Sequence, residues 1–568
     1  VESTAEYDAL GRPTRVVEPD GVTWRQAYDE RGNLVAVTDP TGATTAYDYD
    51  KHGGLVAVRD ALGNVVRIAT DPAGLPLAFT DATGRTVRYR RDFCGRVVEI
   101  VDPVGGSTRF TWTVSGQLRS RTEPDGTVEQ WHHDGETNVV DHIDALGQRT
   151  HTEIAHFDLP VSRTGPDGAR LAFRYDTELR LAAVTNPQGL VWRYEYDAAG
   201  NLVRETDFDG RVLRYGYDAA RRMVRRTNGA GQTVEFTLDP VGRMVERRAG
   251  NDVTRLTYDP ADRVLSAVNA DADLRFGYDP RGLVVAETCN GRTVRSEYDA
   301  MGRRITRTLP SGARSEWTYD AAGAPTQLRV GGHALAMRRD AAGRDIGRTW
   351  GSATISQDWD PVGRLAAQTV TAASGVVQQR EYSYRADGLP TGVRDTLAGS
   401  RAFELDRMGR VTTVTGNAGG QTWTEHYGYD TTGNITDARW PGGDPLTGRR
   451  QYAGTKLTTA GTTSYVHDAQ GRVVRRTGPG PDGRPLNWEF GWTAEDRMVS
   501  VTTPDGQRWR YRYDALGRRI AKQRLGPGDT VAEQVDFTWD GPNLAEEHHR
   551  TPTGQRRLTS WELEPGTD

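Results

Sequence analysis

Tyr298-Asp-Ala-Met-Gly-Arg303 and Tyr513-Asp-Ala-Leu-Gly-Arg518 are two copies of one motif, Tyr-Asp-x-x-Gly-Arg, and this motif decides the fold of the 568-residue chain. It first occurs at Tyr7 and returns every 20 or 21 residues wherever copies are consecutive. Degenerate copies such as Thr70-Asp71 and Trp539-Asp540 fill the remaining intervals in the same register. A fixed period of this length indicates a repeat architecture, so we interpret the chain as one array with no independent domain inside it.

Each period contains two turns with the same chemistry. A second turn signal follows about ten residues after each motif, as in Asp39-Pro-Thr-Gly42 and Pro504-Asp-Gly506. Asp accepts backbone N–H bonds at the start of such a turn, and Gly supplies the positive φ that ends a four-residue hairpin loop. Each period is therefore predicted to run strand, turn, strand, turn. The positions to which we assign this structural role in the best-preserved copies are Tyr7, Asp8, Gly11, Tyr28, Asp29, Gly32, Tyr196, Asp197, Gly200, Tyr217, Asp218, Tyr298, Asp299, Gly302, Tyr319, Asp320, Gly323, Tyr429, Asp430, Gly433, Tyr513, Asp514 and Gly517.

The segment that leads into each motif alternates between aromatic and charged residues. Trp192, Tyr194 and Tyr196 alternate with Arg193 and Glu195. Because successive side chains on a strand point to opposite faces, one face of the sheet is predicted to be aromatic and the other charged. Open twisted sheets rarely exceed about ten strands, whereas this chain predicts about fifty, so the array must curl.

Composition supports a turn-rich β protein and excludes several other classes. Hydrophobic residues make up 36%, the mean hydropathy is -0.66, and there are 65 Gly. Lys and Arg together number 72 against 77 Asp and Glu, and the basic residues are scattered, so nucleic acid is excluded as a partner. No apolar run reaches the ~20 residues needed to span a bilayer, and no signal peptide is visible, so we interpret the chain as a piece of a longer protein. Cys94 and Cys289 are too few to staple the fold and are interpreted as structural thiols.

Two stretches depart from the regular pattern. Between about residues 69 and 160 the motif Tyr is replaced several times in succession, which we interpret as sequence drift rather than a specialised contact surface. The Gly- and Pro-rich stretch Trp440–Gly448 is predicted to be a loop. We therefore divide a single continuous array, residues 1–568, into regular repeats over 1–430 and irregular, longer-looped repeats over 431–568.

Tandem Tyr-Asp-x-x-Gly-Arg copies at this spacing are the signature of YD repeats, and the chain resembles the Rhs proteins of bacteria. It is more distantly similar to the cocoon-forming subunits of insecticidal Tc toxins and to teneurins. The resemblance implies an all-β, spiralling antiparallel hairpin ribbon that forms a large hollow shell. It also implies a role in bacterial competition, in which the shell of a secreted or delivered polymorphic toxin encloses a C-terminal toxin domain lying beyond this chain. That domain would be the enclosed partner, and secretion or delivery components would be further partners.

Rhs toxins typically end their repeat core with an Asp-Pro-x-Gly-Leu motif that serves autoproteolytic release. Asp71-Pro-Ala-Gly-Leu75 and Asp279-Pro-Arg-Gly-Leu283 match these letters. Both lie within the array at the register of ordinary turns, so we assign neither of them a cleavage role.

No pattern of catalytic or metal-binding residues emerges. His151 and His156 flank a Glu, but their spacing of five on a predicted strand does not fit a helical zinc-protease motif. The adjacent pairs His132-His133 and His548-His549 point to opposite faces of a strand and cannot share one metal. We therefore expect no enzyme activity, cofactor or metal. Rows of Tyr and Arg leave one alternative open, a cell-surface adhesin or carbohydrate-binding protein.

Overall fold

The fold is all-β, as predicted from the repeat. The structure, a computed structural model, describes residues 2–551 and 553–562. These residues form 53 strands in one antiparallel sheet, with two short 3-10 turns at His156–Asp158 and Pro527–Asp529. Each strand pairs with the next strand in the chain, so the sheet is a continuous meander. Within the described residues, no helix is long and apolar enough to cross a membrane.

The strands are grouped here into coils, meaning successive turns of the spiral described below. The first coil contains β1 (Thr4–Tyr7), β2 (Pro13–Val17), β3 (Thr23–Tyr28), β4 (Leu34–Thr38), β5 (Thr44–Tyr49), β6 (Leu55–Arg59), β7 (Val65–Thr70), β8 (Pro76–Thr80), β9 (Thr86–Arg91), β10 (Val97–Val101), β11 (Ser107–Trp112), β12 (Leu118–Thr122), β13 (Val128–His133), β14 (Val139–Ile143), β15 (Arg149–Ile154), β16 (Pro160–Thr164), β17 (Arg170–Tyr175), β18 (Leu181–Thr185), β19 (Val191–Tyr196), β20 (Leu202–Thr206), β21 (Val212–Tyr217), β22 (Met223–Thr227), β23 (Thr233–Leu238) and β24 (Met244–Ala249). The second coil contains β25 (Asp252–Tyr258), β26 (Val264–Val268), β27 (Asp273–Tyr278), β28 (Val284–Cys289), β29 (Arg292–Tyr298), β30 (Arg304–Thr308), β31 (Arg314–Tyr319), β32 (Pro325–Val330), β33 (His333–Arg339), β34 (Asp345–Trp350), β35 (Ala353–Trp359), β36 (Leu365–Ala372), β37 (Gly375–Tyr384), β38 (Pro390–Asp395), β39 (Gly399–Leu405), β40 (Val411–Ala418), β41 (Gln421–Tyr429), β42 (Ile435–Arg439), β43 (Gly448–Ala453), β44 (Lys456–Ala460), β45 (Thr463–His467), β46 (Val473–Pro479) and β47 (Pro485–Trp492). The third, partial coil contains β48 (Met498–Thr502), β49 (Arg508–Tyr513), β50 (Arg519–Leu525), β51 (Val531–Asp540), β52 (Asn543–Arg550) and β53 (Arg556–Ser560).

One hairpin shows how the motif sets the register. In the β19–β20 pair, Glu195 lies opposite Arg204, but Tyr196 lies opposite Leu202, so the pairing shifts immediately before the motif Tyr. The same shift recurs before the motif in the other YD hairpins of the first coil. A β-bulge of this kind increases local twist, so a bulge in every repeat makes the ribbon coil steadily.

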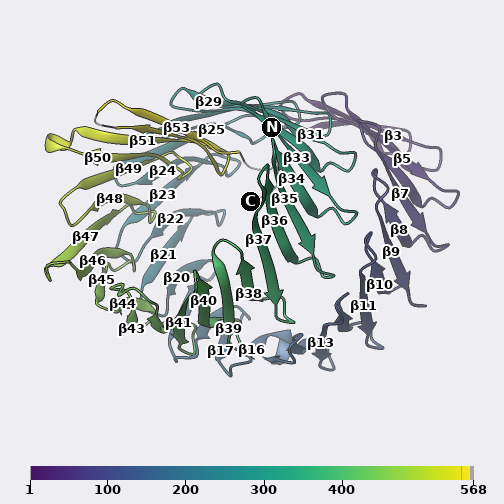
Figure 1. The fold of residues 1–568 in the computed structure, drawn as a ribbon. Helices are drawn as coiled ribbons and strands as arrows, with labels where there is room; N and C mark the ends of the chain where they lie inside the picture. Colours follow the sequence, from purple (N-terminus) through teal and green to yellow (C-terminus); the bar gives the residue numbers. More distant parts are fainter. Residues whose placement is uncertain (1, 552, 563–568) are drawn as a thin grey trace.

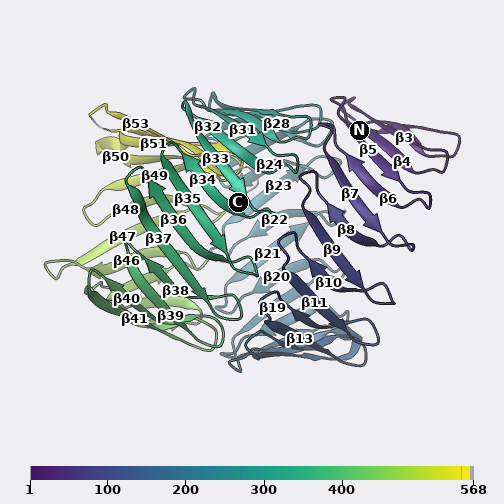
Figure 2. The ribbon, with the colours of Figure 1, turned by 45° about the vertical axis from the view of Figure 1, so that its right-hand side comes forward.

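The ribbon winds into a spiral, which Figure 1 shows as a ring of strands running from purple through teal to yellow. In Figure 2, turned by 45°, the green strands β33–β38 lie on the near side next to the dark blue strands β8–β11, and hydrogen bonds such as that from Arg364 to Asp125 join this later coil to the earlier one. Hydrogen bonds join residues separated by 233 to 268 positions in sequence, which sets the length of one coil. We call this line of contact between successive coils the seam.

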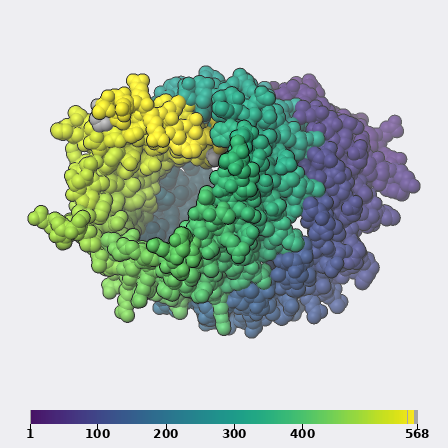
Figure 3. Space-filling view, viewed as in Figure 1, coloured from purple at the N-terminus to yellow at the C-terminus, as the bar shows by residue number. Residues whose placement is uncertain are grey.

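The wall of the spiral is thin and its centre is hollow. Figure 3 looks through an opening between green and yellow strands onto the far wall of the molecule. Within the described part of the chain, every buried side chain lies at or beyond Ser162. Small apolar clusters form where the third coil meets the second, for example around Leu274 with Ala515 and around Leu309 with Ala545. The hollow all-β shell that the resemblance implied is therefore the observed fold.

Irregularity increases along the second coil. Strands lengthen from four to six residues in the first coil to eight in β36 and ten in β37. β42 and β43 are joined by only two residue pairs, and the connection between them is a loop, as the sequence predicts for this region. The assignment of residues 1–430 and 431–568 to two classes of repeat stays a prediction.

Candidate functional site: the seam between coils

The YD turns that keep the motif aspartate are organised around it. Asp259 Oδ1 accepts the backbone N–H groups of Ala261 and Arg263 at 2.9 Å each, and its Oδ2 accepts Nε of Arg263 at 2.5 Å. Burial alone would raise the pKa of Asp259, but the bonds from the backbone and side chain of Arg263 outweigh it and lower that pKa. The carboxylate is thus fully used in shaping the turn.

The arginine of the motif connects one repeat to the next. The Arg263 guanidinium lies over the ring of Tyr278, 5.1 Å from its centroid, while the Tyr278 hydroxyl donates to the Val264 carbonyl at 2.8 Å. The ring is therefore held by a cation–π contact on one face and by a hydrogen bond at its end. The same pairing of arginine with the next aromatic recurs at Arg12 and Tyr28, Arg180 and Tyr196, Arg243 and Tyr258, Arg303 and Tyr319, Arg364 and Tyr384, and Arg410 and Tyr429.

Several degenerate copies keep the hydrogen bond even though the Tyr is lost. Trp112 donates Nε1 to the Val97 carbonyl at 2.9 Å, and Arg91 donates Nε to the Pro76 carbonyl at 3.2 Å. Trp359, Trp492 and Trp539 donate in the same way. These replacements conserve a donor that reaches the preceding repeat, so drift alone does not describe them.

The seam joins two different edges of the ribbon. One edge carries the YD turns and the other carries the second turns of each repeat. Arg263 Nη2 bonds Asp20 Oδ2 at 2.7 Å, and Arg364 and Arg410 bond Asp125 and Asp167 at 3.3 and 3.5 Å. Each arginine belongs to a YD turn of the second coil. Each partner carboxylate belongs to a Pro-Asp-Gly second turn of the first coil: Pro19-Asp20-Gly21, Pro124-Asp125-Gly126 and Pro166-Asp167-Gly168.

Other polar side chains continue the seam between these pairs. The bonded residues are Gln188 with Asp430, Asp209 with Thr455, Gly229 with Gln470, Gln232 with Arg472, Asn269 with Tyr513, and Asp271 with Arg512. In all of them a second turn of one coil meets a YD turn, or its degenerate equivalent, of the next coil. The seam follows the same rule at each of these points.

The seam is most buried where the third coil covers the second. Glu287 is 5% exposed, pairs with Arg518 at 2.6 Å, and accepts the Gly541 N–H at 2.9 Å. Burial raises the pKa of the Glu287 carboxyl. Beside it, Asp540 binds both Nη atoms of Arg304 at 2.5 and 2.9 Å. Removing Arg518 would leave the buried Glu287 carboxylate without its ion-pair partner.

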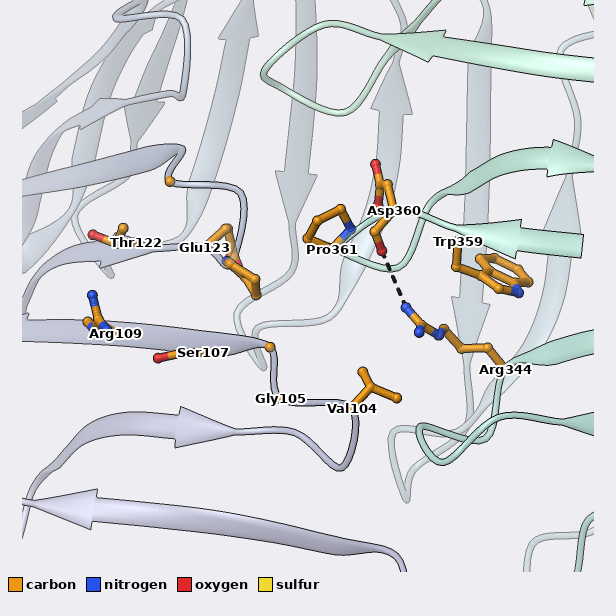
Figure 4. Close-up of a pocket in the computed structure, with 13 residues that line it drawn as sticks. Val104, Gly105, Ser107, Arg109, Thr122, Glu123, Arg344, Trp359, Asp360 and Pro361 are labelled. Carbon is orange, nitrogen blue, oxygen red and sulfur yellow. Dashed lines mark hydrogen bonds between the residues drawn. The ribbon is translucent and has the colours of Figure 1, made fainter.

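Between the bonded points the seam opens into shallow clefts rather than an enclosed active site. Figure 4 shows one cleft of about 570 Å³, where Val104, Glu123 and their neighbours in the first coil face Arg344 and Asp360 in the second. Arg344 Nη1 bonds the Asp360 carbonyl at 3.3 Å within one face of that cleft. The remaining charged group of the turn, the Asp360 carboxylate, is bonded by Arg364.

The predicted repeat positions are distributed along the ribbon and do not converge on one point. Asp8, Asp29, Asp197 and Asp218 lie in first-coil turns, whose edge meets no other coil within the described residues. Asp320 and Asp430 lie in second-coil turns at the seam, where Arg85 and Gln188 bond them. Asp299 closes its own turn through Arg303, and Asp514 lies in the third coil with its carboxylate bonded by Arg518. The matching glycines all have positive φ: Gly11, Gly32, Gly200, Gly302, Gly323, Gly433 and Gly517.

The arginine that follows the motif glycine was considered only as part of a glycan-binding row, and its bonds across the seam were not predicted. The sequence does indicate that this arginine has a role, because Arg recurs directly after the motif Gly in many copies. Its partner, however, lies more than 230 residues away. The motif tyrosines were interpreted as packing residues, and their bond to the preceding repeat was also missed.

Other residues considered for chemistry are placed as follows. His132, Asp141 and His151 lie opposite one another on β13, β14 and β15, and Asp141 is bonded by His151 and Arg149. Across the described ranges, no group of three or more His, Cys, Asp or Glu side chains is positioned to hold a metal ion. Both cysteines are free, and burial raises the pKa of Cys289 to about 11. Asp71 and Asp279 of the Asp-Pro-x-Gly-Leu matches each accept two backbone N–H groups of their own turn.

Comparison with known proteins gives consistent matches. The RHS Repeat family model matches residues 7–44, 28–65, 71–108, 94–128, 175–212, 278–314 and 492–526. The chain is 32% identical over 278 residues to the probable deoxyribonuclease RhsA of Dickeya dadantii, a match covering 44% of this chain and 18% of that protein. It is 31% identical over 281 residues to the toxin protein Tse5 of Pseudomonas aeruginosa, covering 43% of this chain and 21% of that protein.

The fold is also found among solved structures. The crystal structure of TcdB2-TccC3 without its hypervariable C-terminal region matches with a TM-score of 0.69 at 12% identity. That match covers 99% of this chain and 42% of the other. The chain thus spans about a fifth of the curated relatives that it matches and less than half of the solved one.

Proposed function

We propose that residues 1–568, in which the RHS Repeat family model matches several segments, form one continuous wall of a toxin-encapsulating shell. The wall would enclose and protect a C-terminal toxin domain that lies beyond this chain. The repeat wall itself would have no catalytic role, and any enzyme activity would belong to the enclosed domain. The protein would be a secreted or delivered effector that uses secretion or delivery components as further partners.

One observation carries this proposal: the ribbon coils around a hollow and is sealed against itself by a bonded seam (Figure 3). A binding platform does not need this second feature, whereas a container does. The turn carboxylates and buried seam charges are occupied in holding the wall together. Their use in structure supports a wall whose function is enclosure.

Protease protection tests the proposal in the protein that carries this chain together with the polypeptide encoded after Asp568. The downstream polypeptide should survive digestion by a nonspecific protease when attached to the shell, and should be degraded when produced alone. A variant with Arg364→Glu and Arg410→Glu should lose this protection, because like charges would then face Asp125 and Asp167 across the seam.

Arg12→Glu with Arg180→Glu is the matched control, because among the described residues these arginines contact the aspartates of their own turns and the next Tyr, but no other coil. That variant should keep the downstream polypeptide protected. Equal digestion of the attached and isolated polypeptide would contradict enclosure. A stop codon directly after Asp568 in the coding sequence would also contradict it.

The contacts of the Tyr rows do not favour the alternative of a glycan-binding adhesin. A sugar ring would stack on an exposed aromatic face. In the repeats one face of the Tyr ring is covered by Arg and the hydroxyl is bonded to backbone. The rows that motivated this alternative are thus used for contacts between repeats.

A further inference from the structure

The hairpin formed by β43 and β44 is only weakly paired with the strands on either side (Figure 1). β43 pairs with β42 at two residue positions, and β44 pairs with β45 at two, whereas the nearby ladders β40–β41 and β46–β47 have six and five pairs. Among the described residues of the hairpin, 448–460, only Ala460 is buried. A segment with short ladders and little buried surface opens locally before its neighbours do.

The turn at the tip of this hairpin has no aspartate of its own. In a regular YD turn the carboxylate accepts backbone N–H groups of the same turn, as Asp259 does. Here Gly454 and Thr455 join the two strands, and the acceptor is Asp209, from a second turn of the first coil. Asp209 accepts the Thr455 N–H and the Thr455 hydroxyl at 2.6 Å each. The first coil therefore completes, across the seam, a turn that regular hairpins close by themselves.

Glycine at position 454 allows the close approach of this carboxylate. A Cβ at Gly454 would overlap the Asp209 carboxyl group, and the backbone of Gly454 has φ +65°. Both features favour glycine over any residue with a side chain. The shape of the turn thus fits an acceptor supplied from outside the hairpin.

The opposite end of the hairpin is attached differently. At this base, the backbone N–H of Gly461 donates to the Arg449 carbonyl and that of Thr462 to the Pro445 carbonyl, at 2.9 Å each. These bonds lie within the second coil and do not depend on the seam. The base can therefore stay attached as a hinge when the tip is released.

The seam is hollowed on both sides of the tip. A cleft of about 540 Å³ extends from Thr455 and Phe208 to Met408, in an earlier repeat of the second coil. A second cleft, of about 440 Å³, extends from the same two residues to His467, in a later repeat. The bond from Thr455 to Asp209 crosses the seam between these clefts, so its loss would join them.

We propose that the β43–β44 hairpin is a gate in the wall, that Asp209 is its latch, and that the open gate passes an extended polypeptide. What passes rests on the proposed enclosing function, whereas the latch does not. Neighbouring strands lie ~4.8 Å apart, so swinging two strands out of the wall leaves about 14 Å between β42 and β45. One extended chain fits this gap. A folded domain of ~100 residues, with a radius of gyration of about 13 Å, does not.

Hydrogen–deuterium exchange of the whole protein tests the latch. Asp209→Ala should accelerate exchange in β43–β44 about 30-fold, the effect of losing hydrogen bonds to a charged group, and should leave β41 and β47 unchanged. The matched control is Asp167→Ala, which removes a carboxylate from the same position of another second turn. Its partner Arg410 still bonds Asp406 of its own turn, so exchange in β43–β44 should stay at the wild-type rate. Equal exchange of β43–β44 in Asp209→Ala and the wild type would overturn the proposal.

A reversible crosslink tests passage through the gate and does not depend on the Asp209→Ala variant. Asp209→Cys with Thr455→Cys places two thiols where the wild-type side chains meet, and Cys94→Ser removes the exposed free thiol. In the protein that includes the polypeptide encoded after Asp568, bead-bound trypsin should digest that polypeptide at least tenfold more slowly in the oxidised form than in the reduced form.

The two assays separate failure of the gate from failure of the enclosing function. Equal digestion of the oxidised and reduced forms would overturn passage through the gate. A downstream polypeptide that is digested in both forms as fast as when produced alone would contradict enclosure itself. In that case the exchange of β43–β44 still decides whether Asp209 latches the hairpin.

Discussion

Arg263→Ala should loosen two places 243 residues apart in sequence, and this coupling tests the seam directly. The guanidinium bonds Asp259 within its turn, lies over Tyr278, and bonds Asp20 across the seam. The Arg263 and Asp20 side chains are 23% and 10% exposed, so the cross-coil bond is poorly screened by solvent. A hydrogen bond between charged groups in this setting contributes about 1.5–3 kcal/mol. A loss near 2 kcal/mol corresponds to ~30-fold faster exchange through local opening.

Hydrogen–deuterium exchange of the native protein is the suitable assay, because a repeat array opens locally rather than in one step. In Arg263→Ala, exchange should accelerate in the β25–β26 hairpin and also in the distant turn around Asp20. The matched control is Arg12→Ala, which loses the same contacts with its own Asp8 and with Tyr28 but faces no other coil. Its effect should stay within its own hairpin and the next. If Arg263→Ala left the turn at Asp20 unchanged, the seam pair would contribute nothing and the reasoning would be wrong.

Three further predictions concern the repeat itself. Tyr319→Phe removes a 2.6 Å bond from the hydroxyl to the Arg304 carbonyl and should lower local stability by about 1–2 kcal/mol, measured by exchange of β30 and β31. Arg221→Gly should stabilise its hairpin by about 1 kcal/mol, because Arg221 has φ +62° at a position where Gly is unstrained; Gly200→Ala, at φ +86°, should have the opposite effect, and equal effects would refute the strain argument. Turn aspartates such as Asp259 have lowered pKa values, so their stabilisation is present above the unfolded pKa of about 4 and is lost as pH falls through the lowered value. The pKa of Glu287 is raised instead, so its effect on stability has the opposite pH dependence. Its favourable contribution is present at low pH and is lost as pH rises through the raised pKa. Melting temperatures measured against pH test both statements. In Asp259→Asn the melting temperature should fall less steeply at acid pH than in the wild type. In Glu287→Gln the melting temperature should rise relative to that of the wild type as pH increases.

The local structure of this protein could be predicted from its sequence because each repeat is determined by neighbours. Asp259 and Arg263 are four residues apart, and the turn that they form depends on little else. The residue types found at the motif position, Tyr, Trp and Arg, also indicate a shared hydrogen-bonding role. All three side chains carry an N–H or O–H donor at their far end, as Tyr278, Trp112 and Arg91 illustrate. Phe would offer the same apolar area without the donor.

The seam could not be predicted in this way. The partner of Arg263 is set by how far each hairpin rotates relative to the last, and small rotations accumulate over many repeats before Asp20 comes alongside. A slightly different twist per repeat would bring another residue to Arg263. The Pro-Asp-Gly turns at Asp20, Asp125 and Asp167 differ in sequence from neighbouring second turns, but only the assembled coil shows that they face arginines.

The seam changes what kind of repeat protein this is. In a simple array each unit contacts only its two neighbours, and stability is a sum of intrinsic terms and nearest-neighbour terms. Here Arg364 contacts its own turn, the next repeat through Tyr384, and the preceding coil through Asp125. One side chain thus links repeats along the ribbon and across it, and the ribbon becomes a two-dimensional wall. A wall of this kind needs no thick apolar core, which explains how the first 161 residues can hold their shape without a fully buried side chain among those described.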